Sequence, residues 1–257
     1  MPRPDENRPA RPRRLRRPEI GRFTAVVAVG LVILGLHNAA FWQKLWDYSG
    51  GRPLFAAGTA LALFALMGGA LALVALPRLF KPVAIAALLV AAGASYFADR
   101  FGVLIDRSMI ASALETTGRE AGELMTASFF AHMALTGLLP AALLAWVRIR
   151  TPPLGRRLAG NAGFALGAGL VAAAVVLPNY GGYASLFRAH RDLAKSLHPT
   201  APLSAAIKTV ERHFADRDRA IEPLATDARL KPASGARARP QLTVLVVGET
   251  ARAASFS

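Results

Sequence analysis

Five long stretches of this chain contain no Asp, Glu, Lys or Arg. A helix needs about 20 largely apolar residues to cross the hydrocarbon core of a bilayer. Each stretch approaches or exceeds that length, and a bilayer offers no water to satisfy a free backbone, so each predicts a membrane-spanning helix. The stretches are Phe23–Trp42, Pro53–Leu76, Pro82–Ala98, Leu124–Val147 and Ala159–Leu177. The expected fold is therefore mostly α, with a five-helix transmembrane domain over residues 23–177.

Basic residues lie at the ends of these stretches. With the N-terminus inside, the inside segments 1–22, 77–81 and 148–158 hold 14 Lys and Arg, whereas the outside segments 43–52 and 99–123 hold five. Cytoplasmic loops carry the excess of Lys and Arg in membrane proteins. The pattern predicts a multi-pass membrane protein with a basic cytoplasmic tail at 1–22 and a C-terminus on the far side of the membrane, which is the periplasm if the cell is Gram-negative.

The formal net charge of +15 has the same explanation. Arginines at the ends of apolar helices set topology and contact anionic lipid headgroups, so nucleic-acid binding is excluded as the reason for the charge. The sequence has no cysteine, which rules out a thiolate nucleophile and a Cys-based metal site. The basic segment RPRRLRRPEIGR resembles the start of a signal peptide, but the long run after it and the poor cleavage site favour an uncleaved anchor.

A polar segment between the third and fourth stretches carries a candidate binding row. A periplasmic helix is expected over about 107–124, where Ser112, Thr116 and Glu120 are spaced four residues apart and so share one face. One interpretation is a solvated amphipathic helix at the membrane interface. The other is a lipid-headgroup site, because a carboxylate accepts hydrogen bonds from an ammonium group.

Residues 178–241 are expected to form periplasmic bridging helices and a linker. Short helices are expected to break at Pro199 and Pro202, and residues 228–241 have the composition of a linker. His190 and the arginines beside it either anchor this region at the membrane surface or contact phosphate. His37 and His132, in or near spans, are interpreted as packed or interfacial side chains rather than a proton relay.

The last residues begin a different kind of structure. Leu242–Val247 is a continuous aliphatic and β-branched run, typical of a strand covered on both faces. Residues 242–257 therefore predict the truncated start of an α/β domain. Ligands in such sheets bind at the carboxyl ends of the strands, which makes Glu249 a candidate metal or substrate ligand. The alternative is a charged turn in which Thr250 caps a helix.

Four stretches, in order, resemble the lipid A phosphoethanolamine transferase family. They are HNAAFW, SYFADRFGVLIDRSMIASALETT, LFRAHRDLAKSLHPT and VVGETAR followed by FS. The similarity covers nearly the whole chain from about Phe23. It implies a protein of the bacterial inner membrane, with an alkaline-phosphatase-like (sulfatase-like) periplasmic domain after the membrane domain.

The resemblance also implies a chemistry. Enzymes of this family move phosphoethanolamine from phosphatidylethanolamine to lipid A through a phospho-threonine at a zinc site, which modifies lipopolysaccharide and confers polymyxin resistance. Glu249 matches a zinc ligand of the family, whereas the nucleophilic threonine is expected downstream of Ser257, so Thr250 is not that residue. Thr116 and Glu120 match positions proposed to hold the donor headgroup, and Ser112 stands where the family usually has Asn.

The resemblance leads to several expectations about this chain. It is interpreted as the N-terminal part of a zinc enzyme, inactive as given because it lacks the nucleophile and most metal ligands. The expected partners are phosphatidylethanolamine as donor, lipid A as acceptor and membrane lipids, and the expected state is a monomer. The alternatives are a phosphoglycerol or other glycan phosphotransferase of the same superfamily, and a non-catalytic membrane or lipid-binding protein.

Overall fold

The computed structural model describes residues 17–106, 109–110, 122, 124–150 and 152–217, and the side chains of these residues up to 211. Residues up to Arg217 belong to one compact unit. The predicted linker at 228–241 and the predicted strand at Leu242–Val247 lie outside the described residues, as does nearly all of the helix expected at about 107–124.

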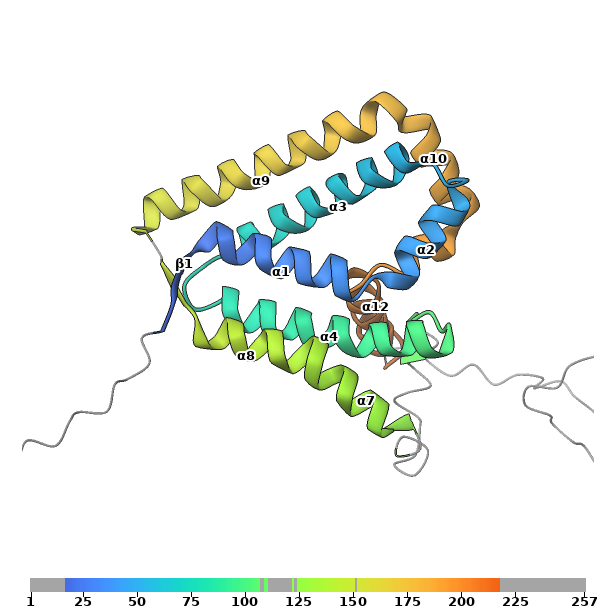
Figure 1. The fold of residues 1–257 in the computed structure, drawn as a ribbon, viewed down its shortest axis with the longest axis horizontal. Coiled ribbons are helices and arrows are strands. Elements are labelled where there is room, and N and C mark those ends of the chain that lie inside the picture. Colours follow the sequence, from blue (N-terminus) through green and yellow to red (C-terminus); the bar gives the residue numbers. More distant parts are fainter. Residues whose placement is uncertain (1–16, 107–108, 111–121, 123, 151, 218–257) are drawn as a thin grey trace, which may run out of the picture. The chain divides into compact units, whose positions relative to one another are not determined.

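Long helices lie side by side across the membrane domain. Their order across the bundle is α9, α3, α1, α4 and then the α7–η1–α8 helix (Figure 1). The bounds of these elements are α1 Arg22–Leu36, α3 Pro53–Leu73, α4 Phe80–Phe101, α7 Ala127–His132, η1 Met133–Leu138, α8 Leu139–Trp146 and α9 Leu154–Val176. Among the residues that the structure describes, four helices are long and apolar enough to cross a bilayer, and one bent pair of helices passes the same test. The predicted helical membrane domain is confirmed within the described residues.

Helix boundaries follow from local residue chemistry. Pro53 is the first helical residue of α3, a position where the missing N–H costs nothing. Gly102 ends α4 in a left-handed conformation with φ of 65°, and its N–H donates to the carbonyl of Ala98 at 3.0 Å. These boundaries place the start of α3 and the end of α4 at the same end of the bundle, the α2–α10 end (Figure 1).

The first predicted span, Phe23–Trp42, is broken into two helices. α1 ends at Leu36, and α2, Ala39–Tyr48, leaves at an angle of 66°. Two side chains satisfy the carbonyl groups at the break: Asn38 donates to Ile33 O at 2.9 Å and Trp42 donates to Leu34 O at 2.7 Å. An apolar run alone does not reveal such a break, because the run stays uncharged through it.

The other spans differ from the predictions mainly in extent. The fourth contains a π-helical segment, η1, in its middle. The fifth does not stop at Leu177: α9, the short 3-10 turn η2 Leu177–Asn179 and α10 Tyr180–Ala189 form 36 continuous helical residues. At about 1.5 Å per residue this length exceeds the hydrocarbon core of a bilayer, so α10 extends past it.

A pair of short parallel strands, which the sequence did not predict, closes the opposite end of the bundle. β1, Glu19–Gly21, pairs with β2, Arg148–Arg150, in the register Glu19 with Arg148. Arg150 also forms an exposed ion pair with Glu19 at 3.1 Å. The pairing joins the chain before α1 to the chain after α8 (Figure 1).

The bundle is apolar on its outer faces as well as inside. Exposed large apolar side chains on the spans include Leu54, Leu61, Leu66, Leu135, Leu143, Leu166 and Leu170. So many exposed large apolar side chains are untypical of a soluble monomer and suit contact with lipid. The inner side of α1, by contrast, packs against α3 and α4 through Val26, Ile33 and Leu88.

Candidate headgroup-binding site

The α2–α10 end of the bundle is held together by its own apolar cluster. α11, Arg191–Lys195, and α12, Thr200–Arg217, follow α10 and return the chain toward α2. The cluster joins α2, α3, α10 and α11, and its buried members are Phe41, Leu45, Phe55, Tyr183, Leu186 and Leu193. Complete burial of one such side chain contributes roughly 1.5–3 kcal/mol. The polar groups around the cluster are therefore held in position by packed helices.

Asn38 links these packed helices to the break in the first span. Its side chain accepts from the backbone N–H of His198 at 2.7 Å and donates to the carbonyl of the same residue at 3.1 Å. Both residues are buried. Burial, together with nearby His37, lowers the pKa of His198 to about 4, so its ring is neutral at physiological pH.

Asp192 accepts hydrogen bonds from two side chains of α2. Lys44 Nζ and the Tyr48 hydroxyl each donate to Asp192 Oδ2 at 2.9 Å. Burial alone raises the pKa of Asp192, but the hydrogen bonds from Lys44 and Tyr48 outweigh that effect and hold it below its usual range. The ring of Tyr48 also stacks on His190, with centroids 3.8 Å apart. This contact packs His190 against α2.

A cavity of about 460 Å³ lies between α2, the end of α4 and α11. Charged groups of both signs line it: Lys44 and Asp47 from α2, and Asp99 from α4. The carboxyl group of Asp99 lies by the backbone N–H of Ala40 at the start of α2. A cavity with a cation and two carboxylates at the end of a membrane bundle is complementary to a zwitterionic headgroup.

A second cavity, of about 530 Å³, lies beside α11 and α12. Its polar lining includes Asp106, Ser204 and Lys208, and Lys195 forms an ion pair with Asp106 at 3.7 Å. Residues 103 and 104 line the first cavity and residues 105 and 106 line the second. The same short segment therefore contributes to both.

That segment leads directly into the predicted binding row. Ser112, Thr116 and Glu120 lie outside the described residues, as does Glu249, and their assignments stay predictions. The described chain before them, through Asp106, lies at the two cavities. Sequence reasoning missed Lys44, Asp99 and Asp192. The signal available for Asp99 and Asp192 was that they lie within SYFADRFGVLIDRSMIASALETT and LFRAHRDLAKSLHPT, two of the stretches that resemble the family.

The two membrane histidines are packed, as predicted. His37 is fully buried, with Nε2 3.1 Å from the carbonyl of Thr136 in the π-helical segment. His132 Nε2 lies 3.1 Å from the hydroxyl of Ser95 on α4. Each histidine thus ties one helix to another.

No group of three His, Asp or Glu side chains that could hold a metal ion occurs within the part of the chain that the structure describes. The described membrane domain therefore does not fit a zinc site.

Comparison with known proteins gives a consistent result. The sequence profile described as "Phosphoethanolamine transferase EptA/EptB" matches residues 63–214. The chain is 30% identical over 254 residues to phosphoethanolamine transferase EptA of Escherichia coli K12, covering 95% of this chain and 46% of that protein. It is also 30% identical over 247 residues to phosphatidylethanolamine transferase Mcr-1 of Escherichia coli, covering 92% of this chain and 44% of the relative. The chain thus spans about half the length of the curated relatives it matches.

A solved structure shares the fold. The integral membrane lipooligosaccharide phosphoethanolamine transferase A (EptA) from Neisseria meningitidis superposes with a TM-score of 0.73 at 22% identity, covering 77% of this chain and 38% of that protein. The predicted arrangement of transmembrane helices is therefore that of a known multi-pass membrane protein.

Proposed function

This chain belongs to the phosphoethanolamine transferase EptA/EptB family, and from that premise we propose that the whole protein transfers phosphoethanolamine from phosphatidylethanolamine to lipid A. The added amine would reduce the negative charge of the surface, so that cationic peptides such as polymyxins bind less well. From the family we place the protein in the bacterial inner membrane, and from the distribution of Lys and Arg we place the N-terminus in the cytoplasm and the C-terminus in the periplasm.

The mixed-charge cavity at the α2–α10 end carries the proposal for the membrane domain. Phosphatidylethanolamine has an anionic phosphate and a cationic ammonium group in one headgroup. In this proposal Lys44 faces the phosphate, while Asp47 and Asp99 face the ammonium. Ser112, Thr116 and Glu120, on the segment that leaves this cavity, complete the donor site.

The chemical step lies elsewhere in this proposal. Glu249 would serve as one zinc ligand, and the nucleophilic threonine would follow Ser257 in the whole protein. Zinc would supply a Lewis acid that lowers the pKa of the nucleophile and stabilises charge on the phosphoryl oxygens. The described residues hold no such site, and we derive no step through the metal.

Headgroup selectivity tests the donor site. The chain in mild detergent is titrated with phosphatidylethanolamine or with phosphatidylcholine of identical acyl chains, whose trimethylated nitrogen has no N–H to donate. We expect phosphatidylethanolamine to bind about tenfold more tightly, as a charge-assisted hydrogen bond to a carboxylate would give. Asp99→Asn and Glu120→Gln are each expected to remove most of this preference.

The matched control is Glu211→Gln, which neutralises an exposed carboxylate on α12 away from the cavity. Equal binding of the two lipids, or equal loss in the control variant, would refute this donor site. The reaction itself is tested by the mass of lipid A from cells that produce the whole gene product. That mass separates phosphoethanolamine transfer from phosphoglycerol transfer and from no transfer.

A further inference from the structure

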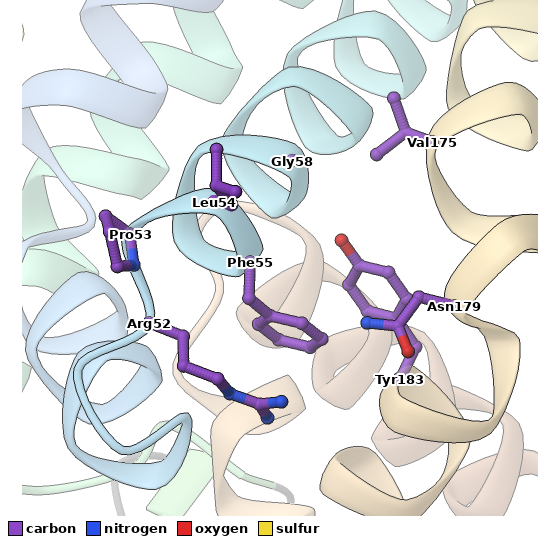
Figure 2. A pocket seen from close by; sticks show the side chains of 8 residues that line it. All are labelled: Arg52, Pro53, Leu54, Phe55, Gly58, Val175, Asn179 and Tyr183. Atoms are coloured by element: carbon purple, nitrogen blue, oxygen red, sulfur yellow. The ribbon is translucent and has the colours of Figure 1, made fainter.

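A third cavity, separate from the two described above, lies on the other side of α2, where α3 begins and α9 passes into α10. It is a groove of about 450 Å³ whose walls come from both helices (Figure 2). Its polar groups are Arg52, Asn179 and Tyr183, and its apolar walls include Leu54 and Val175. None of these residues lines either cavity of the donor site.

Arg52 is held in position at this groove. Its Nε donates to the carbonyl of Ser49 at 2.8 Å, and its guanidinium lies 5.1 Å from the ring centroid of Phe55. The ring of Phe55 in turn stacks on Tyr183, with centroids 4.4 Å apart (Figure 2). Within the described residues, Arg52 forms no ion pair, and its two terminal nitrogens donate no hydrogen bond to a protein acceptor.

The lining of the groove selects the charge of its ligand. It contains one cation and no carboxylate. The side chains of Asn179 and Tyr183 add further polar groups that form no hydrogen bond with the described part of the chain. A guanidinium binds phosphate in a bidentate manner, whereas an ammonium needs an acceptor that this lining lacks.

The position of the groove at the end of the spans favours a lipid as its ligand. Pro53 begins the span α3, and Val175 lies next to the last residue of α9, so the groove sits where a span meets the headgroup region. Leu54 is 88% exposed beside it. Gly58 keeps the floor open, because a Cβ there would lie 3.1 Å from the Tyr183 hydroxyl and 3.2 Å from Val175.

We propose that this groove binds an anionic glycerophospholipid, with its phosphodiester on Arg52 and Asn179 and an acyl chain along Leu54 and Val175. The site is separate from the donor site and favours a headgroup without an ammonium group, such as that of phosphatidylglycerol. A lipid there would contact both α3 and the α9–α10 helix, which are the elements that carry Phe55 and Tyr183.

Lipid retention tests this proposal. The 257-residue chain in mild detergent is incubated with phosphatidylglycerol or phosphatidylcholine of identical acyl chains, and bound lipid is counted by native mass spectrometry. We expect phosphatidylglycerol to be retained about tenfold more strongly, as one charge-assisted bidentate contact would give. Arg52→Ala is expected to reduce its retention to the phosphatidylcholine level, and Arg52→Lys to reduce it partly.

Leu54→Glu supplies a second variant that leaves Arg52 in place. It puts a carboxylate into the lining at the first turn of α3, where a negative charge suits the helix, so folding is preserved. Loss of phosphatidylglycerol retention is expected, because the new carboxylate pairs with Arg52 and repels phosphate. Arg156→Ala, which removes an exposed arginine in the first turn of α9, outside the groove, is the matched control.

Three results would overturn the proposal. They are equal retention of the two lipids, full retention by the Leu54→Glu variant, and a loss in Arg156→Ala as large as that in Arg52→Ala. The last would assign the binding to general surface charge.

Discussion

Asn38 and His198 are 160 residues apart in the chain, yet the side chain of one holds both backbone groups of the other. The amide oxygen of Asn38 accepts from the N–H of His198, and its amide nitrogen donates to the carbonyl. Asn38 also donates to Ile33 at the end of α1. One side chain therefore closes the broken first span and attaches the segment between α11 and α12 to it.

We expect Asn38→Ala to destabilise the chain by about 3 kcal/mol, because it leaves buried N–H and carbonyl groups without partners. The effect should be local, with residues 196–205 becoming cleavable in limited proteolysis. Asn161→Ala is the control, since Asn161 is also buried but donates to Ala75 at the opposite end. Cleavage at 196–205 in both variants, or in neither, would contradict the assigned role of Asn38.

The ion pair between Lys44 on α2 and Asp192 on α11 should stabilise the chain only weakly. The Lys44 and Asp192 side chains are 30% and 32% exposed, so solvent screens the ion pair. A double-mutant cycle with Lys44→Met and Asp192→Asn is expected to give a coupling energy of about 0.5–1 kcal/mol in detergent unfolding experiments. A coupling above about 2 kcal/mol would mean that the pair acts as a buried one, and none at all would mean that the contact is not formed.

The sequence predicts the membrane domain well because the signal is simple. A bilayer requires about 20 residues without charge, and a search for charge-free runs locates α3, α4, the α7–η1–α8 helix and α9. The same rule cannot see the break after Leu36. Asn38 is polar but uncharged, and its partner at His198 is too distant in the chain for any local pattern to reveal.

The candidate site was predictable only as separate pieces. HNAAFW and LFRAHRDLAKSLHPT both resemble the family, but no spacing rule pairs Asn38 with His198. Asp192 also has no local signal, because a carboxylate beside Arg191 suggests an ordinary solvated helix. Its two donors arrive from α2, almost 150 residues earlier. The groove at Arg52 needs α3 and α9 side by side, which apolar helices of similar composition do not specify.

The stability of the chain should fall between about pH 6.5 and pH 4 because of His198. Its pKa is about 4 in the folded chain, against 6.5 for a free histidine side chain. The unfolded chain therefore binds a proton in this window that the folded chain does not, and stability is lost as the pH falls. We expect a slope of up to about 1.4 kcal/mol per pH unit, measured by unfolding in mixed micelles.

His198→Leu is expected to flatten this dependence while keeping the backbone contacts with Asn38. Asp192 acts in a different window: its pKa is lowered, so its stabilising effect is present above the unfolded pKa of about 4 and is lost only in more acidic solution. An unchanged slope between pH 6.5 and pH 4 in the His198→Leu variant would contradict the burial of a neutral ring.

Gly160 on α9 makes room for Arg22 at the β1–β2 end. A Cβ at Gly160 would collide with the Arg22 guanidinium, which lies 4.5 Å from the ring centroid of Phe23. Gly160→Ala therefore forces the end of the flexible Arg22 side chain to move, and this cost offsets the better helix propensity of Ala, so the change is expected to be about neutral. In an Arg22→Ala background the same change should stabilise the chain by about 1 kcal/mol. Gly163→Ala is the matched control on the same helix, since a Cβ there meets nothing within 4 Å, and it should be stabilising or neutral in both backgrounds. If Gly160→Ala is no more stabilising without Arg22 than with it, the Arg22 side chain does not restrict position 160.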